Sequence, residues 1–483
     1  MRNVYDKVSG ISVRILYLLT AALLVMFFWI NIKPKQTPVF LYTSLGVALV
    51  FLLILCKRYH SVRLHVPERY ALISLLLCCF LVKLMWVLCV QTEPEVDYLT
   101  FYETAEQYAQ TYTLPSTWLQ RYISLFPHIF GYASFLSLFF ALFGASPLVA
   151  VFLNVVLSVI QTALLYYIGK KTVSHGGGIL AGVIWILLPS QTIYNMYVLS
   201  EPLYTAGILL AIALLVYTRG CMDEMSYARL AAYGGILSLV LVLTNMVRPL
   251  APILLTALLI WLFLIDNKKM FRKKAVYSIT VLAAYLVLLS FSQQYTTARI
   301  GAEITSLPGY NIYVGFNQET AGTWNEEDSN TFFEYAGDDR FDAPQVQQRM
   351  FQLAKERVIN GGIDYKKLFI DKFDALWGDD SACVGYAYDA IPNPMFWTMA
   401  SNVFYYILFF FALLGAVFGL FRKSRSATAF AALYFIGLTL GHMFTEVALR
   451  YHYSGLISLT LLSVYGICAM TKKTLRRKDH ASR

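Results

Sequence analysis

The sequence predicts an all-α polytopic membrane protein, and three observations support this fold class. Of its 483 residues, 58% are hydrophobic and only 14% are charged. Apolar runs of roughly twenty residues recur along the chain, the length that a bilayer core about 30 Å thick requires of a helix. Basic residues gather in the short stretches between these runs, where they orient helices and meet anionic lipid head groups. The net charge of +10 therefore predicts membrane lipids, and no nucleic acid, as partners.

Thirteen apolar segments are candidates for membrane spans. The first lacks a small-residue cleavage site, so it predicts a membrane helix rather than a cleaved signal peptide. None of the seven cysteines belongs to a CxxC pair, so neither a disulfide framework nor a zinc site is expected. In order, the segments are 11–30, 38–56, 70–91, 126–143, 147–168, 177–197, 200–217, 229–247, 249–265, 275–292, 396–420, 427–445 and 453–470.

The basic loops predict which side of the membrane each segment end faces. The stretch CKRYHSVRLHVPER, after the second segment, is rich in Lys, Arg and His and is predicted to be cytoplasmic, which places Asp97 outside. Later basic stretches fall inside together only if one segment between Asp97 and Lys170 does not cross. These stretches are GKKTVSHGG, RGCMDEMSYAR, DNKKMFRKK, FRKSRS and TKKTLRRKDHASR.

The Phe-rich segment 126–144 is the shortest candidate for that exception, and it suits a helix lying in the membrane interface. We therefore predict a multi-pass protein of the cell membrane with about twelve transmembrane helices and both termini cytoplasmic. In the alternative, segment 126–144 spans the membrane. That topology would move the five later basic loops to the outside.

Four regions follow from this topology. Residues 1–60 predict an extra N-terminal transmembrane hairpin, and 61–292 predict a transmembrane core with outer juxtamembrane helices at 98–144. Residues 293–395 predict a small extracytoplasmic α/β domain, and 396–483 predict C-terminal transmembrane helices with a basic cytoplasmic tail. In the extracytoplasmic domain, LPGYNIYVGFNQETAGTWNEEDSN predicts loops and short strands. The following KERVINGGIDYKKLFIDKFDALWG predicts a helix that is interrupted at its Gly-Gly pair.

Polar residues converge at the predicted outer ends of the helices, where charged groups can be paired or hydrated. Asp97 is the candidate catalytic residue, and the other residues are candidates for binding substrate. Glu446 and Arg450 are expected to share a helical face at i,i+4. Lys83 lies about 12 Å below the outer end of its span, at roughly 1.5 Å per residue, and is expected to snorkel outward. The candidate binding residues are Glu95, His128, Glu201, Arg248, Glu446, Arg450, Tyr451, His452 and Lys83.

Each of these residues also has a simpler explanation. A carboxylate that follows a span, such as Asp97, is often only solvated, and Glu201 suits the N-terminus of a helix. Arg248 and Arg450 suit the anchoring of helix ends at lipid phosphates, and both histidines suit the interface. Acids and arginines that gather on one face, at one depth, favour an active site over these separate explanations.

Such a site suits the transfer of a sugar from a polyprenyl phosphate. The phosphate of the donor would lie at the outer interface, where arginines bind its anionic oxygens. One carboxylate is then enough as general base, because inversion requires only deprotonation of the acceptor hydroxyl and the phosphate is a competent leaving group. No Gly-rich nucleotide loop is visible in the sequence, which agrees with a lipid-borne donor.

The sequence also resembles a known family at these residues. EPEVDYLTFYETA, LFPHIFGYASFLSLFFALFG and LLYYIGKKTVSHGGGILAGVIWILLPSQTIYNMYVLSEPL resemble, in order and spacing, the GT-C fold membrane glycosyltransferases. The likeness is closest to bacterial members related to the protein mannosyltransferases and lipid A aminoarabinose transferases, a glycosyltransferase family 39-like group. NIYVGFNQETAGTW and EVALRYHYSG also look like that group.

This resemblance implies an inverting mechanism and a polyprenyl-phosphate donor such as undecaprenyl phosphate carrying a sugar. It implies that Asp97, which matches the family's acid in the first outer loop, is the catalytic base or binds the acceptor. Several relatives carry adjacent Asp-Glu there, whereas this chain has EVD, so the role of Glu95 stays open. The lipid-linked sugar is a co-substrate, so no cofactor is expected. Metal dependence varies among these enzymes, and none is predicted here because no dense Asp/His cluster is visible.

Two other interpretations stay open. A transporter or flippase of lipid-linked sugars would place polar sites near the bilayer midplane, often within internal repeats, and the sequence has neither feature. A glycan polymerase or ligase of related fold would change only the acceptor. The sequence does not specify the sugar, or whether the acceptor is a glycan, a lipid or a protein of the cell envelope. It also leaves open whether an upstream carrier-lipid glycosyltransferase is a physical partner.

Overall fold

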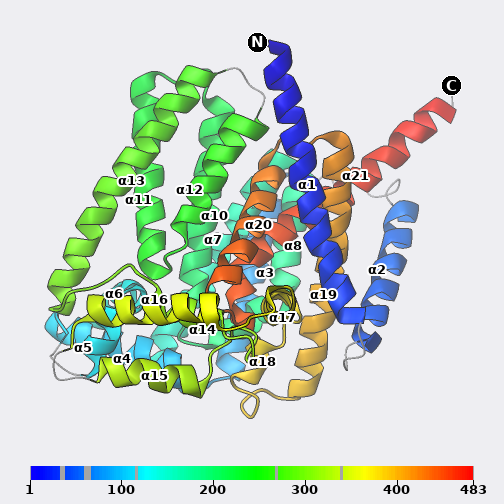
Figure 1. Cartoon of the computed structure of the whole chain (residues 1–483). Coiled ribbons are helices and arrows are strands. Elements are labelled where there is room, and N and C mark those ends of the chain that lie inside the picture. The colour runs from blue at the N-terminus through cyan, green and yellow to red at the C-terminus, as the bar shows by residue number, and fades with distance from the viewer. Residues whose placement is uncertain are drawn as a thin grey trace.

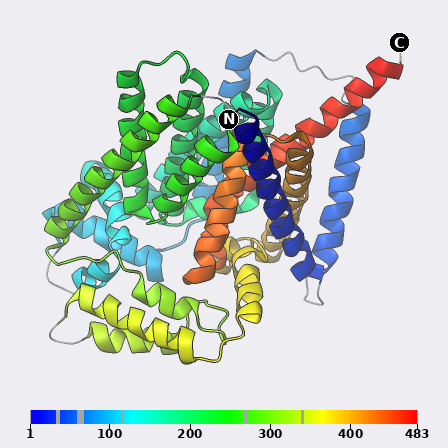
Figure 2. The same ribbon diagram turned by 45° about the horizontal axis from the view of Figure 1, so that its top comes forward.

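The computed structural model describes residues 2–32, 38–58, 67–114, 118–266, 270–337 and 341–481. Every regular element within these residues is helical and none is a strand. Figure 1 shows long helices standing side by side, with a group of shorter helices lying across one end of the bundle. Figure 2 shows that α15 and α16 lie outside the bundle, beyond the ends of the long helices.

Twelve helices in the described residues, from 10 to 31 residues long, form most of the bundle. They are α1 (Arg2–Ile32), α2 (Pro38–Arg58), α3 (Glu68–Cys89), α7 (Pro147–Thr172), α8 (His175–Leu187), α10 (Glu201–Cys221), α11 (Tyr227–Val247), α12 (Ala251–Ile260), α13 (Phe271–Ile300), α19 (Pro394–Arg422), α20 (Ala427–Phe444) and α21 (Leu456–Ala481). The remaining elements are α4 (Val96–Thr111), α5 (Trp118–Leu125), α6 (His128–Phe143), α9 (Pro189–Ile193), η1 (Tyr194–Met196), η2 (Trp261–Ile265), α14 (Gly309–Gly315), α15 (Glu326–Ala336), α16 (Ala343–Asn360), α17 (Tyr365–Trp377), α18 (Ala382–Gly385) and η3 (Leu449–Gly455).

The prediction of a multi-pass helical membrane protein is confirmed, but the count of twelve spans is not. Nine helices in the described residues are long and apolar enough to cross a membrane, or eleven if each of two bent helix pairs is one span. The expected span 177–197 is broken, because Pro189 starts a new short helix that bends by 67° from α8. The expected span 249–265 is a shorter helix that ends in the π-helical turn η2.

Several basic loops lie together at one end of the bundle. Asp266 pairs with Arg219 at 2.6 Å and with Lys274 at 2.9 Å, so the ends of α10, η2 and α13 meet there. Ser9 Oγ donates to the Ile265 carbonyl at 2.7 Å, which brings the start of α1 to the same place. In Figure 1 the N- and C-terminal labels both lie at this end, opposite α4, α5 and α14–α16. The compartment that each end faces stays a prediction.

The helices expected to be juxtamembrane, α4 and α6, pack against each other at the opposite end. Helices α5 and α6 meet at 117°, so the segment from Trp118 to Phe143 does not run straight. An added Cβ at Gly131 in α6 would lie 1.9 Å from the carbonyl oxygen of Met246, near the end of α11. Glycine therefore permits α6 to cross α11 at backbone contact.

The prediction of short strands in residues 293–395 is wrong, because every regular element in the described part of that range is a helix. The stretch NIYVGF, which has strand-like composition, forms helix α14 and packs against α16. An added Cβ at Gly309 would lie 1.9 Å from the carbonyl oxygen of Gln347, so this contact between helices again requires glycine. The helix expected farther on is confirmed, with its break between α16 and α17 at Gly361 and Gly362.

The first helix packs into the bundle rather than standing apart with α2. Helix α1 lies against α19 and α20, and α2 lies against α19. Tyr17 and Thr428 hydroxyls are 3.1 Å apart, and the Tyr406 hydroxyl donates to Asn31 Oδ1 at 3.2 Å. The middle of α1 is thereby bonded to α20, and its C-terminal end is bonded to α19.

Candidate active site

Asp97 lies in the first turn of α4, where an extended segment turns into the helix. Glu95 has extended backbone angles (φ −131°, ψ 157°), and its carbonyl accepts a hydrogen bond from the Tyr98 amide. The carboxylate of Asp97 is thereby held at a helix N-terminus, where the backbone amides favour negative charge. Its side chain is 43% exposed, so it can meet a substrate.

Arg450 forms an ion pair with Asp97. Nη2 of Arg450 donates to Oδ2 of Asp97. Arg450 belongs to η3, at the start of the last span, and its side chain is only 15% exposed. No other hydrogen bond to the Asp97 carboxylate occurs within the described residues, so Oδ1 is available to a substrate.

Three tyrosine rings surround the Arg450 guanidinium. The guanidinium carbon lies 5.9 Å from the ring centroids of Tyr98 and Tyr386 and 5.8 Å from that of Tyr451. These rings come from α4, from the residue after α18 and from η3. Cation–π contacts of this kind fix the direction of a guanidinium in a partly dry site, so Arg450 holds the Asp97 carboxylate in a defined orientation.

A second ion pair lies beside the first. Arg248, which follows α11, pairs with Glu201 at the start of α10. The Glu201 side chain is 5% exposed and that of Arg248 is 17% exposed. The Arg248 guanidinium carbon lies 5.2 Å from the Tyr451 ring centroid, so Tyr451 stands between the two arginines.

Glu446 and Arg450 do not share a helical face as expected. Helix α20 ends at Phe444, residues 446–448 have no regular secondary structure, and Arg450 belongs to a 3-10 helix. The Glu446 carboxylate instead accepts a hydrogen bond from Asn311 Nδ2 at 3.0 Å. Hydrogen bonds with residues 311–322 and with Lys372 hold the backbone at this break.

Residues 311–322 and Lys372 hydrogen-bond to or lie against residues 445–447, which lead to Arg450. The Glu446 amide donates to the Asn311 carbonyl at 2.7 Å, and the Val447 amide donates to the Gly322 carbonyl at 3.0 Å. Lys372 Nζ donates to the carbonyls of Gly315 and Thr445 at 2.6 and 2.7 Å. The two late stretches that resemble the glycosyltransferases, NIYVGFNQETAGTW and EVALRYHYSG, are therefore in direct contact.

Three of the predicted site residues do not belong to the cluster of the two ion pairs around Tyr451. The expectation that Lys83 snorkels outward is wrong: Lys83 is fully buried, and its Nζ donates to Thr192 Oγ1 at 2.6 Å because α9 supplies a polar partner inside the bundle. His452 is also buried, with Nε2 3.1 Å from Asp380 Oδ1. Glu95 is exposed and contributes its backbone to the start of α4.

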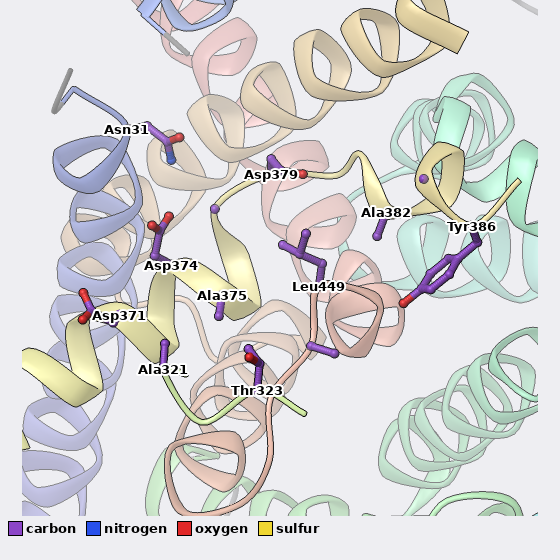
Figure 3. A pocket seen from close by; sticks show the side chains of 13 residues that line it. Asn31, Ala321, Thr323, Asp371, Asp374, Ala375, Asp379, Ala382, Tyr386 and Leu449 are labelled. Carbon is purple, nitrogen blue, oxygen red and sulfur yellow. The ribbon is translucent and has the colours of Figure 1, made fainter. Parts of the chain in front are cut away.

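Two cavities lie beside the two ion pairs formed by Arg248 and Arg450. The larger, which we call the acidic cavity, has a volume of about 770 Å³ and is lined by Asp371, Asp374, Asp379 and Tyr386, among others. Figure 3 shows the Tyr386 ring extending from α18 toward Leu449, with the three carboxylates on the other side of the cavity. Tyr386 also packs on Arg450, so one side chain lies between this cavity and the Asp97–Arg450 pair.

The second, which we call the arginine cavity, has a volume of about 440 Å³. Its polar wall includes Arg248, the predicted residue His128 at the start of α6, and Tyr451. Its apolar wall comes from α11, α12 and α13 and includes Met246, Leu250, Tyr285 and Leu289. Arg248 and Tyr451 line this cavity and also belong to the cluster formed by the Asp97–Arg450 and Arg248–Glu201 ion pairs around Tyr451.

The site residues that sequence reasoning missed are mostly aromatic or amide side chains. Tyr98 adjoins Asp97 in the sequence, but nothing in the sequence places Tyr386 or Asn311 near it. His442, a lone histidine in an apolar helix, also lines the arginine cavity. Within the described ranges, no group of three or more His, Cys, Asp or Glu residues suits a metal ion, and the absence of a metal requirement stays a prediction.

Comparison with known proteins gives structural likenesses only. No family model matches the chain, and no curated protein is similar to it in sequence. The chain is similar to the oligosaccharyltransferase AglB from Archaeoglobus fulgidus, described in complex with an inhibitory peptide and a dolichol-phosphate (12% identity, TM-score 0.44, 86% of this chain and 52% of that one). A second structure of that protein, tethered with an acceptor peptide, has 12% identity and a TM-score of 0.48 and covers 82% of this chain and 49% of that one.

The chain is also similar to ArnT from Cupriavidus metallidurans bound to undecaprenyl phosphate, with 10% identity, a TM-score of 0.35 and coverage of 81% of this chain and 77% of that one. The chain spans about half the length of the two oligosaccharyltransferase chains. These proteins are of the kind that the sequence resembles.

Proposed function

We propose that this chain is a GT-C-type membrane glycosyltransferase. It transfers a sugar from a polyprenyl-phosphate donor to an acceptor in the cell envelope, with inversion, and Asp97 is the general base. One observation carries the proposal: the Asp97–Arg450 pair and the Arg248–Glu201 pair meet around Tyr451, between two cavities.

The donor fits the arginine cavity. A polyprenyl phosphate has an apolar chain and an anionic head, and this cavity joins an apolar wall from α11–α13 to Arg248. Arginine recognises phosphate with its planar fork of donors, even in a partly buried site. The phosphate would therefore lie at Arg248, with its chain directed between the long helices.

The acceptor fits the acidic cavity. Its volume of about 770 Å³ is enough for a polar group of several sugar or amino-acid units, and its carboxylates accept hydrogen bonds from hydroxyl or amine donors. An acceptor hydroxyl that passes Tyr386 would reach Asp97. Donor and acceptor would thus approach the same carboxylate from opposite sides.

The chemistry that follows is a single displacement. Asp97 Oδ1 takes the proton of the acceptor hydroxyl as that oxygen attacks the anomeric carbon of the sugar. The bond between the anomeric carbon and the phosphate oxygen breaks, and its electron pair leaves with the polyprenyl phosphate. Arg248 and Arg450 stabilise the charge that develops on the phosphate. The reaction as proposed uses no cofactor beyond the lipid-linked sugar, and its product, a polyprenyl phosphate, must be recharged by a separate enzyme.

The test compares envelope glycans, by mass analysis, from cells that express the wild type or Asp97→Asn. Glu103→Gln is the matched control, because Glu103 is an exposed acid on the same helix. We expect one glycan species to lose a fixed sugar mass in Asp97→Asn cells and not in control cells. If the glycans of Asp97→Asn cells match those of wild-type cells at equal protein levels, the proposal is refuted. Movement of labelled lipid-linked sugar across liposomes without product would support a transporter instead.

A further inference from the structure

The arginine cavity contains two hydrogen-bond acceptors that the proposed displacement does not use, His442 and Glu446. Both line the cavity together with Arg248 and Tyr451. His442 lies in the last turn of α20, and Glu446 lies in the non-helical segment that follows. Their position beside the proposed phosphate site raises the question of what they bind.

The tautomer of His442 is determined by its neighbour. Nδ1 lies 3.2 Å from the backbone carbonyl oxygen of Glu446. A carbonyl oxygen only accepts hydrogen bonds, so Nδ1 carries the hydrogen and the neutral ring presents Nε2 as an acceptor. The ring stacks on Tyr451, with centroids 5.2 Å apart and planes at 26°, which fixes its direction.

Nε2 of His442 lacks a partner. The residue is 7% exposed, and within the described part of the chain no group bonds to this nitrogen. Buried polar atoms are normally paired. An unpaired acceptor at the wall of a cavity therefore points to a donor on whatever occupies the cavity.

Glu446 supplies a second acceptor. Its Oε2 is bonded by Asn311 Nδ2 at 3.0 Å, and its backbone amide is bonded to the Asn311 carbonyl at 2.7 Å. No described residue bonds to the other carboxylate oxygen. The side chain is thus held in place by one oxygen and keeps the other for a ligand.

Two acceptors next to a guanidinium select one class of ligand. A bare phosphate has few hydrogens to donate and would meet the Glu446 carboxylate at close range. A hydroxylated ring donates to both acceptors, while a phosphate attached to it accepts from Arg248, whose Nε is also buried without a partner in the described residues. We infer that His442 and Glu446 bind ring hydroxyls of the donor sugar and so determine which lipid-linked sugar is used. This inference rests on the proposed function.

The experiment measures the affinity of the purified full-length protein for undecaprenyl phosphate and for undecaprenyl phosphate bearing glucose, mannose or galactose. His442→Phe keeps a ring that can stack on Tyr451 but removes Nε2, and Glu446→Gln keeps the shape but removes the charge. His175→Phe is the matched control, because His175 starts α8 at the opposite end of the bundle and lines neither cavity.

We expect at least one lipid-linked sugar to bind the wild type more tightly than undecaprenyl phosphate. The measured quantity is the affinity for that lipid-linked sugar divided by the affinity for undecaprenyl phosphate. His442→Phe and Glu446→Gln should each reduce this ratio by about tenfold, the effect of one lost hydrogen bond. The affinity for undecaprenyl phosphate itself should stay within about twofold of the wild type. A ratio that does not change, or the absence of any preference for a sugar-bearing lipid, overturns the inference and leaves the phosphate site standing. A wild type that binds none of the four lipids contradicts the proposed function itself. Glu446→Gln decides the outcome if His442→Phe does not fold.

Discussion

Arg450 donates a hydrogen bond to Asp97 across 353 positions of the chain. The bond joins the first turn of α4 to the start of the last span. It places a half-exposed carboxylate beside a guanidinium that three tyrosine rings hold. The position of the proposed base therefore depends on helices from both ends of the sequence.

Asp97→Asn should lower the transfer rate by about 10²–10⁴-fold, the usual contribution of a general base. The free energy of unfolding should fall by about 1–3 kcal/mol, because Asn keeps an oxygen that can accept from Arg450 but leaves that guanidinium, which is only 15% exposed, without its counter-ion. Single-turnover transfer and thermal unfolding of the same preparation measure the two effects. Full activity of a folded Asp97→Asn enzyme would rule out the assigned role.

Arg248→Met should lower the free energy of unfolding by roughly 3 kcal/mol, because it leaves the Glu201 carboxylate buried without its partner. The double variant Arg248→Met/Glu201→Gln should recover most of that stability, since no buried charge is left. Donor binding should stay weak in both variants. Recovery of binding in the double variant would show that Arg248 has only a structural role.

Lys372 should make stability depend on pH. Burial lowers the pKa of Lys372 to about 7, whereas the unfolded chain titrates near its ordinary value of 10.5. Between these values the unfolded state binds more protons, so stability rises with pH, by at most about 1.4 kcal/mol per unit for this group. Below pH 7 both states are protonated and this contribution does not change.

The measurement is chemical or thermal unfolding between pH 7 and pH 9 of the wild type and of Lys372→Met. We expect the rise in stability to flatten in Lys372→Met, and activity to fall because the Gly315 and Thr445 carbonyls lose their donor. Lys366→Met, an exposed position on the same helix, serves as the control and should behave like the wild type. Equal slopes in all three proteins would contradict the assigned pKa.

Gly315→Ala should reduce activity by disturbing the segment that leads to Arg450. A Cβ at this position would lie 2.5 Å from the backbone carbonyl carbon of Thr445, so one of the two backbones must move. Gly235→Ala is the control: an added Cβ there meets nothing within 4 Å, and alanine in a helix is expected to be neutral or stabilising. Wild-type transfer by Gly315→Ala would show that Arg450 tolerates displacement of this segment.

The predicted topology can be tested by labelling in a cysteine-free background. A cysteine at position 103 (Glu103→Cys), at the end that holds the site, should react with an impermeant maleimide on intact cells. A cysteine at position 171 (Lys171→Cys), at the end of α7, should react only after permeabilisation. Both positions are exposed. Reversed labelling would place the site in the cytoplasm and exclude an extracytoplasmic acceptor.

The sequence alone was sufficient for the membrane class and for the approximate positions of most apolar helices, because hydrophobic length and basic loops are local properties that a bilayer selects directly. It also selected Asp97, Glu201, Arg248 and Arg450 as candidates, since charges are scarce in such a chain and those at helix ends stand out; the structure joins them in two ion pairs, and their roles in a reaction stay predictions. It misplaced Lys83 and His452, because a polar side chain in an apolar helix is equally compatible with an interface and with a buried partner.

The pairing of these charges was decided only by the tertiary structure. Which arginine meets which acid depends on the crossing of helices hundreds of residues apart, and no local pattern encodes that geometry. The helical fold of 309–315 was decided in the same way, because packing of Gly309 against α16 overrides the strand-like composition of NIYVGF. Hydrophobicity is a property of each residue and can be read directly from the sequence. A site formed by distant segments exists only after the helices have packed against one another.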